Sequence, residues 1–355
     1  MTQTAHEARL HHAPAPPARR RRMPSNGALA AVVAVLLLVA GIVGLLLERQ
    51  RTYDRSIARI TGALPAGTDR PPERAGRGET WLLVGSDRRA DGATTGQDAD
   101  APVTGARADT IMLVHLPEHR DGVYVVSLPR DAWVPVEGHG KAKINAAYAY
   151  GGPSLLTSTI EDLTGVRIDH FAAIDFAGFA AMTDALGGVY VEIAESVEDP
   201  DRDVFWAAGW HHLDGARALD FVRQRRNLPR GDIDRITRQQ AYLKALADRA
   251  TDSDVLANPL RLNAFLEAFA GAVSVDETVT IGKLRALALE LSSVRPRDVA
   301  FMTTPIAGMG DEDGQSVVYL DPAESPALFH ALRNDEIDDY VVYTLDAVND
   351  VDRVN

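Results

Sequence analysis

The feature that most constrains this chain is an uncharged apolar run of 20 residues, Ala28–Leu47 (ALAAVVAVLLLVAGIVGLLL). At a rise of ~1.5 Å per residue, a helix of this length spans about 30 Å, the thickness of a bilayer hydrocarbon core. The run ends in three leucines followed by Glu48 and Arg49, which is a poor cleavage site for a signal peptide. We therefore predict an uncleaved transmembrane helix over 28–47.

The flanks of this run bear on its orientation. Residues 1–27 are polar, rich in Pro, Ala and His, and include the block Arg19–Arg22, so we expect a disordered cytoplasmic tail. Four arginines also follow the run within 49–59, so the charges alone leave the orientation near even. Long domains translocate whatever their charge. We expect a single-pass protein of the cell membrane whose main domain lies on the extracellular or periplasmic side.

Beyond the anchor, the sequence divides into a linker and one large domain. Prolines and glycines interrupt a stalk over 48–79, a single domain follows over 80–335, and an acidic tail over 336–355 is expected to be a peripheral extension. Apolar strand-like runs at 81–87, 110–116, 123–128 and 189–193 alternate with helical patterns at 153–163, 175–186, 237–250, 260–272 and 281–291. The runs at 110–116 and 123–128 predict a buried hairpin. This alternation predicts an α/β or α+β domain.

Composition excludes several functions. The formal net charge of −13 argues against a nucleic-acid-binding protein, which normally carries a basic excess. The chain has no cysteine, which excludes disulfides, cysteine nucleophiles and thiolate metal sites. It also lacks the GxxxxGK[ST], HExxH and GxSxG motifs of phosphate-binding loops, zinc proteases and serine hydrolases.

The segment 217–238 concentrates positive charge: it holds seven arginines, three acids and no lysine. Arginine offers a planar fork of donors that matches two phosphate oxygens at once, so the segment indicates a phosphate site, although a surface salt-bridge network would use the same residues. The alternation in Phe221–Arg225 is strand-like and would place Arg223 and Arg225 on one face. Arg107 and Arg130 lie at the ends of predicted strands, where ligand sites commonly form.

Two carboxylates accompany these arginines. Asp87 ends the first apolar strand and Asp109 begins the next apolar run. Two such aspartates could hold a divalent cation together with substrate phosphate oxygens and water. Taken alone, the pair is better explained by capping or turn roles; next to convergent arginines, a metal–phosphate site gains support.

Eight sequence blocks, taken in order, resemble the LytR–CpsA–Psr family of cell-wall glycopolymer ligases. They are LLVGSD (82–87), RADT (107–110), SLPRD (127–131), KINAAYAYGG (143–152), IDHFAAIDFAGF (168–179), DALGGV (184–189), LDGARALDFVRQR (213–225) and DIDRITRQQ (232–240). The resemblance covers about residues 80–307. It implies an α/β domain with α-β-α layers, in which a central mixed sheet is flanked by helices and an apolar groove accommodates a polyprenyl chain.

The resemblance also implies a reaction and its partners. Members of the family transfer a glycan from a polyprenyl-pyrophosphate carrier to a peptidoglycan hydroxyl, forming a phosphodiester at the membrane lipid surface. The implied metal ligands are Asp87 and Asp109, which would bind Mg²⁺, with Mn²⁺ as the alternative. The implied pyrophosphate-binding and catalytic positions are Arg107, Arg130, Arg223, Arg225, Asp232, Arg235 and Gln239.

Some roles stay open at this point. Asp109 and Asp131 are both candidates for the base that takes the hydroxyl proton, although Asp131 and Asp232 could instead orient arginines. Lys143 is a candidate for the rim of the site. The segment 88–106 is longer than in the typical family pattern and predicts a modified rim. Hydrolysis of the lipid pyrophosphate and non-catalytic regulation of the cell envelope are the alternative functions.

Overall fold

The computed structural model describes residues 57–67, 70–74, 76, 78–87, 107–291, 294 and 298–355. Within these ranges the side chains of Asp87, Arg107, Phe176, Ala177, Arg285, Ala288 and Leu345 are not described. The predicted span 28–47, its two flanks and the segment 88–106 lie outside the description. Among the described residues, no helix combines the length and the apolar character needed to cross a membrane.

Strands and helices alternate along the described chain. The strands are β1 (Ala58–Ile60), β2 (Glu79–Asp87), β3 (Arg107–Leu116), β4 (Val123–Ser127), β5 (Trp133–Val136), β6 (Gly140–Lys143), β7 (His170–Asp175), β8 (Val189–Ile193), β9 (Val197–Asp199), β10 (Val204–Trp206), β11 (Gly209–Leu213), β12 (Val273–Asp276), β13 (Val299–Thr303), β14 (Ile306–Glu312), β15 (Gln315–Leu320) and β16 (Arg353–Val354). The helices are α3 (Ile144–Thr164), α4 (Phe176–Ala185), α5 (Gly215–Arg223), α6 (Asp232–Ala250), α7 (Ser253–Leu256), α8 (Pro259–Ala272), α9 (Ile281–Glu290), α10 (Ser325–Asn334) and α11 (Ile337–Tyr343).

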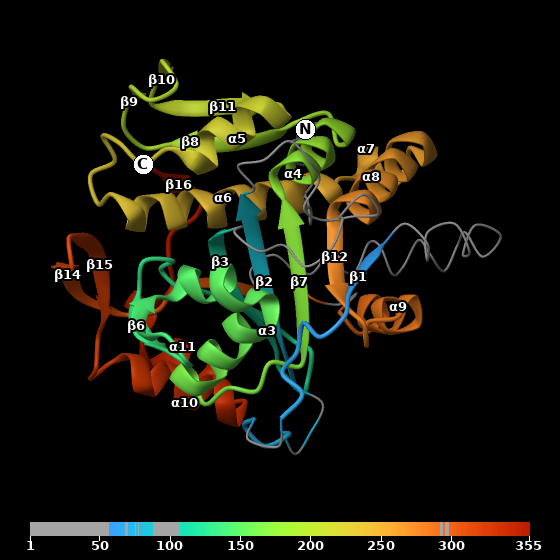
Figure 1. The fold of residues 1–355 in the computed structure, drawn as a ribbon. Helices are drawn as coiled ribbons and strands as arrows, with labels where there is room; N and C mark the ends of the chain where they lie inside the picture. Colours follow the sequence, from blue (N-terminus) through green and yellow to red (C-terminus); the bar gives the residue numbers. More distant parts are fainter. Residues whose placement is uncertain are drawn as a thin grey trace, which may run out of the picture.

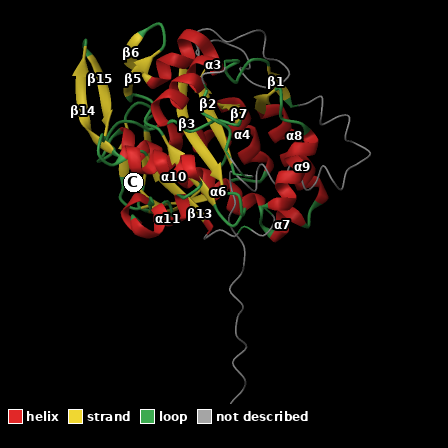
Figure 2. Ribbon diagram, turned by 90° about the horizontal axis from the view of Figure 1, so that it is seen from below, coloured by secondary structure: helices red, strands yellow, loops and turns green. Residues whose placement is uncertain are grey.

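The centre of the molecule is a seven-stranded mixed sheet in the order β1-β12-β7-β2-β3-β4-β13. β2 pairs parallel with β7 and antiparallel with β3, and β3 continues antiparallel to β4, which confirms the predicted hairpin. Helices cover both faces, so the α/β class with a central mixed sheet is confirmed (Figure 1). In Figure 2 the β14–β15 hairpin projects from the side opposite to α7, α8 and α9.

Alternation along the central strands explains why helices cover both faces. On β3, Met112 and Val114 belong to the apolar cluster under α4–α9, whereas Ile111 and Leu113 belong to the cluster under α3, α10 and α11. Side chains in a strand point alternately to opposite faces, and here both sets are apolar and buried. The sheet therefore becomes stable only when helices pack on each side.

The C-terminal segment belongs to the core of the domain, which corrects the expectation of a peripheral tail. Ile337 on α11 is fully buried, and β16 pairs in parallel with β8. The Asn349 side-chain amide donates to Gln240 Oε1 on α6 at 2.7 Å. Apolar residues spaced among the acids of this segment supply the contacts, so its charge alone was a poor guide to its position.

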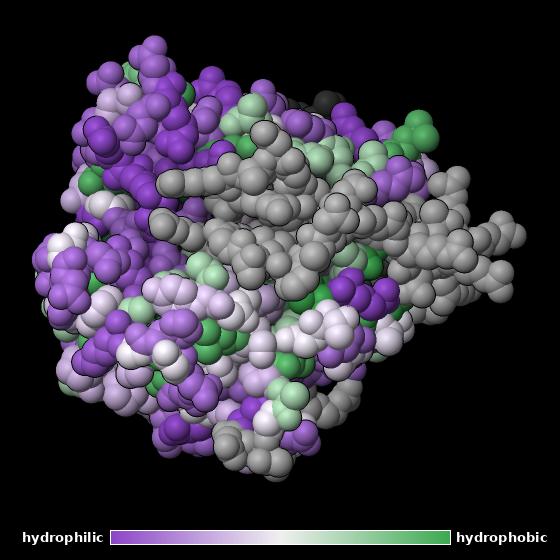
Figure 3. Space-filling model, viewed as in Figure 1, coloured by the Kyte–Doolittle hydropathy of each residue, from purple (hydrophilic) through white to green (hydrophobic). Residues whose placement is uncertain are grey.

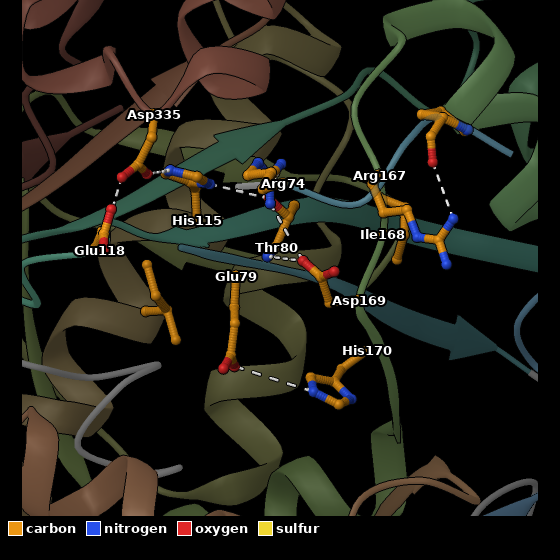
Figure 4. Close-up of polar contacts among 12 residues, drawn as sticks. Arg74, Glu79, Thr80, His115, Glu118, Arg167, Ile168, Asp169, His170 and Asp335 are labelled. Carbon is orange, nitrogen blue, oxygen red and sulfur yellow. Dashed lines mark hydrogen bonds and ion pairs between the residues drawn. The ribbon is translucent and has the colours of Figure 1, made fainter. Parts of the chain in front are cut away.

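A buried polar chain joins the N-terminal end of β2 to the C-terminal end of α10 (Figure 4). His115, fully buried on β3, contacts Thr80 Oγ1 through Nδ1 at 3.0 Å and Asp335 Oδ1 through Nε2 at 2.7 Å. Arg74 donates to Thr80 Oγ1 at 2.8 Å and to Asp169 at 3.2 Å. Burial lowers the pKa of His115 from 6.5, and the hydrogen bond with Asp335 opposes this only in part.

A pH dependence of stability follows from His115. Because its pKa is lowered in the folded state, the unfolded chain binds more protons below about pH 6.5, so the free energy of unfolding decreases as the pH falls from that point. Urea unfolding between about pH 7.5 and 5 should show this loss in the wild type and a shallower one in His115→Gln. The control His330→Gln, at a half-exposed site on α10, should keep the wild-type slope. Equal slopes in all three proteins would contradict the assignment.

A second prediction concerns the contact between α4 and α8. A Cβ atom at Gly178 would lie 2.1 Å from Ala272 Cβ and 2.7 Å from its Cα, so Gly178→Ala forces the helices apart. We expect a loss of about 1–3 kcal/mol in the free energy of unfolding. Gly271→Ala is the matched control on α8: nothing lies within 4 Å of its added Cβ, and it should stabilise by roughly 0.5–1 kcal/mol. Thermal unfolding of both variants tests the difference in sign.

Candidate active site

Charged residues gather at the edge of the sheet where β2 ends and β3 begins. Asp87 and Arg107 are paired across the two strands, and the register shifts between Gly85 and Ser86, where Asp109 is the extra residue on β3. Such a β-bulge re-aims a side chain. Two of the predicted positions are therefore placed here by backbone pairing alone, because the side chains of Asp87 and Arg107 are not described.

The carboxylate of Asp109 is the meeting point of two arginines. Arg130, in the loop after β4, forms a short ion pair with Asp109 Oδ1, and Arg225 NH2 lies 3.5 Å from the same oxygen. Arg130 Nε is also 3.5 Å from Asp131, whose other oxygen binds Lys143 Nζ at 3.1 Å. Predicted residues from four separate sequence blocks thus form one charged network.

A cavity of about 230 Å³ opens beside this network. It is lined by Asp109, Asp201, Arg202, Val222, Arg223, Arg225, Arg235 and Gln239. The surface around β9 and β10 is predominantly hydrophilic (Figure 3). Of the predicted site residues, Arg130, Asp131 and Lys143 do not line the cavity but are linked to Asp109 by ion pairs. Asp232 contacts Arg235. The structure therefore brings the described members of the set together.

The local conformation of the arginine segment differs from the prediction. Arg223 is the last residue of helix α5, and Arg225 follows in the loop after the helix cap at Gln224. The strand-like alternation was therefore wrong: Phe221 and Val222 are buried as part of an amphipathic helix. Both arginines nevertheless line the cavity, because the chain leaves the helix between them.

The turn between Arg223 and Arg225 is held in place by the buried side chain of Arg238. Gln224 is fully buried; its Oε1 accepts from Arg238 NH1 at 2.8 Å, and its Nε2 donates to the carbonyls of Glu198 and Arg226. Arg238 is also fully buried, lies over the Phe221 ring at 4.7 Å, and donates through Nε to the Asn355 carbonyl. Burial lowers its pKa to about 10. These contacts hold the backbone on either side of Gln224 and so position Arg223 and Arg225.

Helix α6 supplies another wall of the cavity. Arg235 is 2% exposed, and its NH2 binds Asp232 in the first helical turn at 2.8 Å. Its Nε has no hydrogen-bond partner among the described residues. Gln239, one turn later, also lines the cavity. Because Arg235 lines the cavity, an anion there would accept hydrogen bonds from its guanidinium.

The electrostatics indicate a site built for an anion. Burial lowers the pKa of Arg235 to about 10, with Asp232 opposing the shift and Arg130 and Arg225 adding to it. Burial and the charge of Arg130 likewise lower the pKa of Arg225, and Asp109 opposes this. Convergent cations disfavour one another's charged forms. Bound phosphate would remove that penalty.

Two cavity residues were not predicted from the sequence. Asp201 and Arg202 form the turn between β9 and β10 and face the same cavity. Asp201 binds Arg226 at 3.1 Å, which fastens the hairpin to the segment after α5. Within the hairpin, Arg202 binds Asp199 at 2.9 Å. The run Glu198–Asp203 (EDPDRD) marks a charged turn, but no sequence feature connects it with the other blocks.

The metal prediction rests on Asp87 and Asp109. The described residues contain no group of three or more histidine or acidic side chains that could hold an ion, and the Asp87 side chain lies outside them. Arg130 and Arg225 both contact Asp109 through Oδ1. Two carboxylates on neighbouring strands, one with a second oxygen, suit Mg²⁺, which completes its shell with phosphate oxygens and water.

Known proteins resemble this chain in both sequence and fold. The pattern of the LytR_cpsA_psr family matches residues 65–334. The "Probable cell wall biosynthesis protein LcpB" of Corynebacterium glutamicum is 40% identical over 261 residues, 72% of this chain and 61% of that protein. The "Polyisoprenyl-teichoic acid--peptidoglycan teichoic acid transferase TagU" of Bacillus mycoides is 33% identical over 178 residues, 50% of this chain and 54% of that protein.

A solved structure agrees with these relatives. The "LytR-Csp2A-Psr enzyme from Actinomyces oris" superposes with a TM-score of 0.60 at 26% identity and covers 79% of this chain and 96% of its own. The chain spans less than two thirds of the length of the two curated relatives above. The family match alone extends over well more than half of the 355 residues. The chain therefore belongs to the LytR_cpsA_psr family.

Proposed function

We propose that this protein is a membrane-anchored phosphotransferase that moves a glycopolymer from a polyprenyl-pyrophosphate carrier to a hydroxyl of peptidoglycan. The observation that carries the proposal is the convergence of Arg223, Arg225 and Arg235 on one small polar cavity, with Arg130 joined to it through Asp109. The name of the TagU relative, a transferase of teichoic acid to peptidoglycan, supports the same reaction class.

The cavity fits a pyrophosphate rather than a whole glycan. Its volume of about 230 Å³ is below the ~300–1,000 Å³ of pockets that enclose drug-sized ligands. Arg223, Arg225 and Arg235 would bind the phosphate oxygens, and Arg107 would join them from β3. Arg130 would act through Asp109, since it is 12% exposed and paired with that carboxylate. The lipid chain and the sugars must leave the cavity in different directions.

The reaction can be written with every bond accounted for. A peptidoglycan hydroxyl oxygen attacks the phosphorus that carries the glycan, and the bond from that phosphorus to the bridging oxygen breaks. The product is a glycan–peptidoglycan phosphodiester, and polyprenyl phosphate leaves with the bridging oxygen. Arginines beside the leaving phosphate stabilise the charge that develops on it. The hydroxyl proton passes to a carboxylate beside the cavity, directly or through one water; a carboxylate paired with arginines is a weak base, so a bridging water is the better first acceptor.

Asp109 is the better placed of the two candidate bases. It lines the cavity, whereas Asp131 is held behind it by Arg130 and Lys143. Asp131 is therefore a positioning residue that orients Arg130, and Lys143 belongs to the same support rather than to the cavity wall. Mg²⁺ held by Asp87 and Asp109 would add positive charge beside the pyrophosphate when bound.

The proposal also includes an apolar groove for the polyprenyl chain, a membrane anchor and the side of the membrane on which the domain lies. A polyprenyl carrier lies in the membrane, so the active site must be tethered close to the lipid surface. The predicted helix over 28–47 would provide this tether, with the catalytic domain outside the cytoplasmic membrane. Hydrolysis, in which water replaces the sugar hydroxyl at the same cavity, is the competing reaction and is separated by product analysis with and without peptidoglycan.

The role of the arginines is tested by Arg225→Ala. Loss of a donor to the pyrophosphate should lower turnover of a polyprenyl-pyrophosphate glycan at least ~100-fold, as removal of a charge-stabilising donor does elsewhere. The matched control is Arg217→Ala, an exposed arginine on α5 that lies over Trp206 and away from the cavity. Wild-type turnover by Arg225→Ala, or an equal loss in both variants, would refute the site.

The metal prediction has a readout that does not depend on turnover. Mg²⁺ at about one hundred times its Kd should raise the free energy of unfolding of the wild type by ~2.7 kcal/mol. Asp109→Asn should abolish that increase, whereas Asp339→Asn, an exposed site on α11, should retain it. Removal of divalent cations with EDTA should stop transfer, and Mg²⁺ or Mn²⁺ should restore it. An increase that survives in Asp109→Asn would exclude this aspartate as a ligand.

A further inference from the structure

A small sheet beside the active site carries exposed aromatic rings. β8 pairs antiparallel with β11 and parallel with β16, and its register sets Trp210 opposite Glu192 and His212 opposite Tyr190. Tyr190 is 60% exposed and Trp210 is 67% exposed. Opposed residues in a sheet point to the same face. We call this set, completed by Arg353 opposite Glu192, the aromatic face.

The two sides of this sheet differ completely in character. The inward positions Val189, Val191, Ile193, Leu213 and Val354 are buried in the core cluster that packs against α6. The outward positions of the three strands are the members of the aromatic face, and none is aliphatic. An outward row of aromatic and hydrogen-bonding groups is not needed for packing, and contiguous exposed rings mark interaction sites.

The rings are held in place before any ligand arrives. His212 Nε2 lies 3.0 Å from the Gly187 carbonyl, and its ring centre is 4.8 Å from that of Tyr190. A Cβ on Gly188 would lie 2.3 Å from His212 Nε2, so the glycine, at φ +91°, leaves room for the ring. Across the sheet, Arg353 Nε is 3.5 Å from Glu192. A preorganised surface loses less conformational entropy on binding.

We propose that the aromatic face binds a neutral polysaccharide strand, which under the proposed function is the glycan of the peptidoglycan acceptor. Pyranose rings combine apolar C–H faces, which stack on aromatic rings, with equatorial hydroxyls, which bond to Glu and Arg. The face is charge-neutral because Glu192 and Arg353 compensate each other, so it favours an uncharged glycan over an anionic lipid surface.

The aromatic face is adjacent along the chain to the hairpin that lines the cavity. The β9–β10 hairpin, whose turn residues Asp201 and Arg202 line the cavity, leads directly into β11. Figure 1 shows β8, β9, β10 and β11 together above α6, the helix that carries Arg235. The cavity is too small for a polymer, so the acceptor strand must lie on the surface. A strand on the aromatic face would extend over the hairpin and bring a hydroxyl toward the cavity.

The proposal is tested by binding without turnover. Chitin oligosaccharides, whose uncharged β-1,4-linked N-acetylhexosamine backbone matches that of the peptidoglycan glycan without its lactyl carboxylates, are titrated calorimetrically against the full chain in detergent micelles. Tyr190→Ala and Trp210→Ala should each weaken Kd about tenfold, and the double variant more, whereas Trp210→Phe should retain most of the affinity. Tyr343→Ala, 86% exposed on α11, is the control and should bind as the wild type does. Thermal unfolding checks that every variant is folded.

The outcomes separate this proposal from the one it rests on. The double variant should still hydrolyse or bind polyprenyl pyrophosphate normally, since the cavity is intact, and lose transfer to peptidoglycan. Normal glycan binding by the double variant would overturn the proposal. So would a change in oligomeric state by light scattering, or a loss of binding to anionic vesicles with glycan binding unchanged, because these assign the face to a second copy or to lipid. Failure of Arg225→Ala to affect turnover would instead refute the cavity, and would leave glycan binding standing.

Discussion

The arrangement of the active site depends on the carboxylate of Asp109. A β-bulge places this residue at the start of β3, and its Oδ1 binds both Arg130 from the loop after β4 and Arg225 from the loop after α5. Without that negative charge, the two guanidinium groups would lie close together at an electrostatic cost. One aspartate therefore allows cations from distant parts of the sequence to converge, and the cations in turn create a site for a more highly charged anion.

Helix α6 connects the cavity with the central sheet and the rest of the domain. Its first turns present Arg235 and Gln239 to the cavity, while Arg238 turns inward to Gln224 and so fixes the loop that carries Arg225. Gln240 Nε2 donates to Ser127 Oγ at the end of β4 and to the Met302 carbonyl on β13, each at 2.8 Å. Side chains of one helix therefore line the cavity, fix the loop that carries Arg225 and bind the central sheet. A change in the helix would move several binding groups together.

The site and the aromatic face are joined by the same elements. The hairpin β9–β10 closes one wall of the cavity and is fastened to the loop after α5 by Arg226 and Gln224. It continues into β11, whose outward residues are exposed rings. A small charged cavity next to a neutral aromatic surface fits the proposed function, in which a pyrophosphate would be held in the cavity and a sugar polymer over many weak contacts.

From the sequence, local patterns predicted β2, β3, β4 and β8, five of the helices and the charged residues of the candidate site, because hydrophobic periodicity and ordered motifs are local properties. The strands β1, β7, β12 and β13, which complete the central sheet, were not predicted. It predicted Asp109, Arg130, Arg225 and Arg235 as one site, and the structure places them together. Three features came from the folded structure alone: Arg223 ends a helix, the acidic C-terminal segment pairs with β8, and Asp201 and Arg202 line the cavity. Each of these depends on contacts between residues far apart in the chain, which propensity and spacing do not encode.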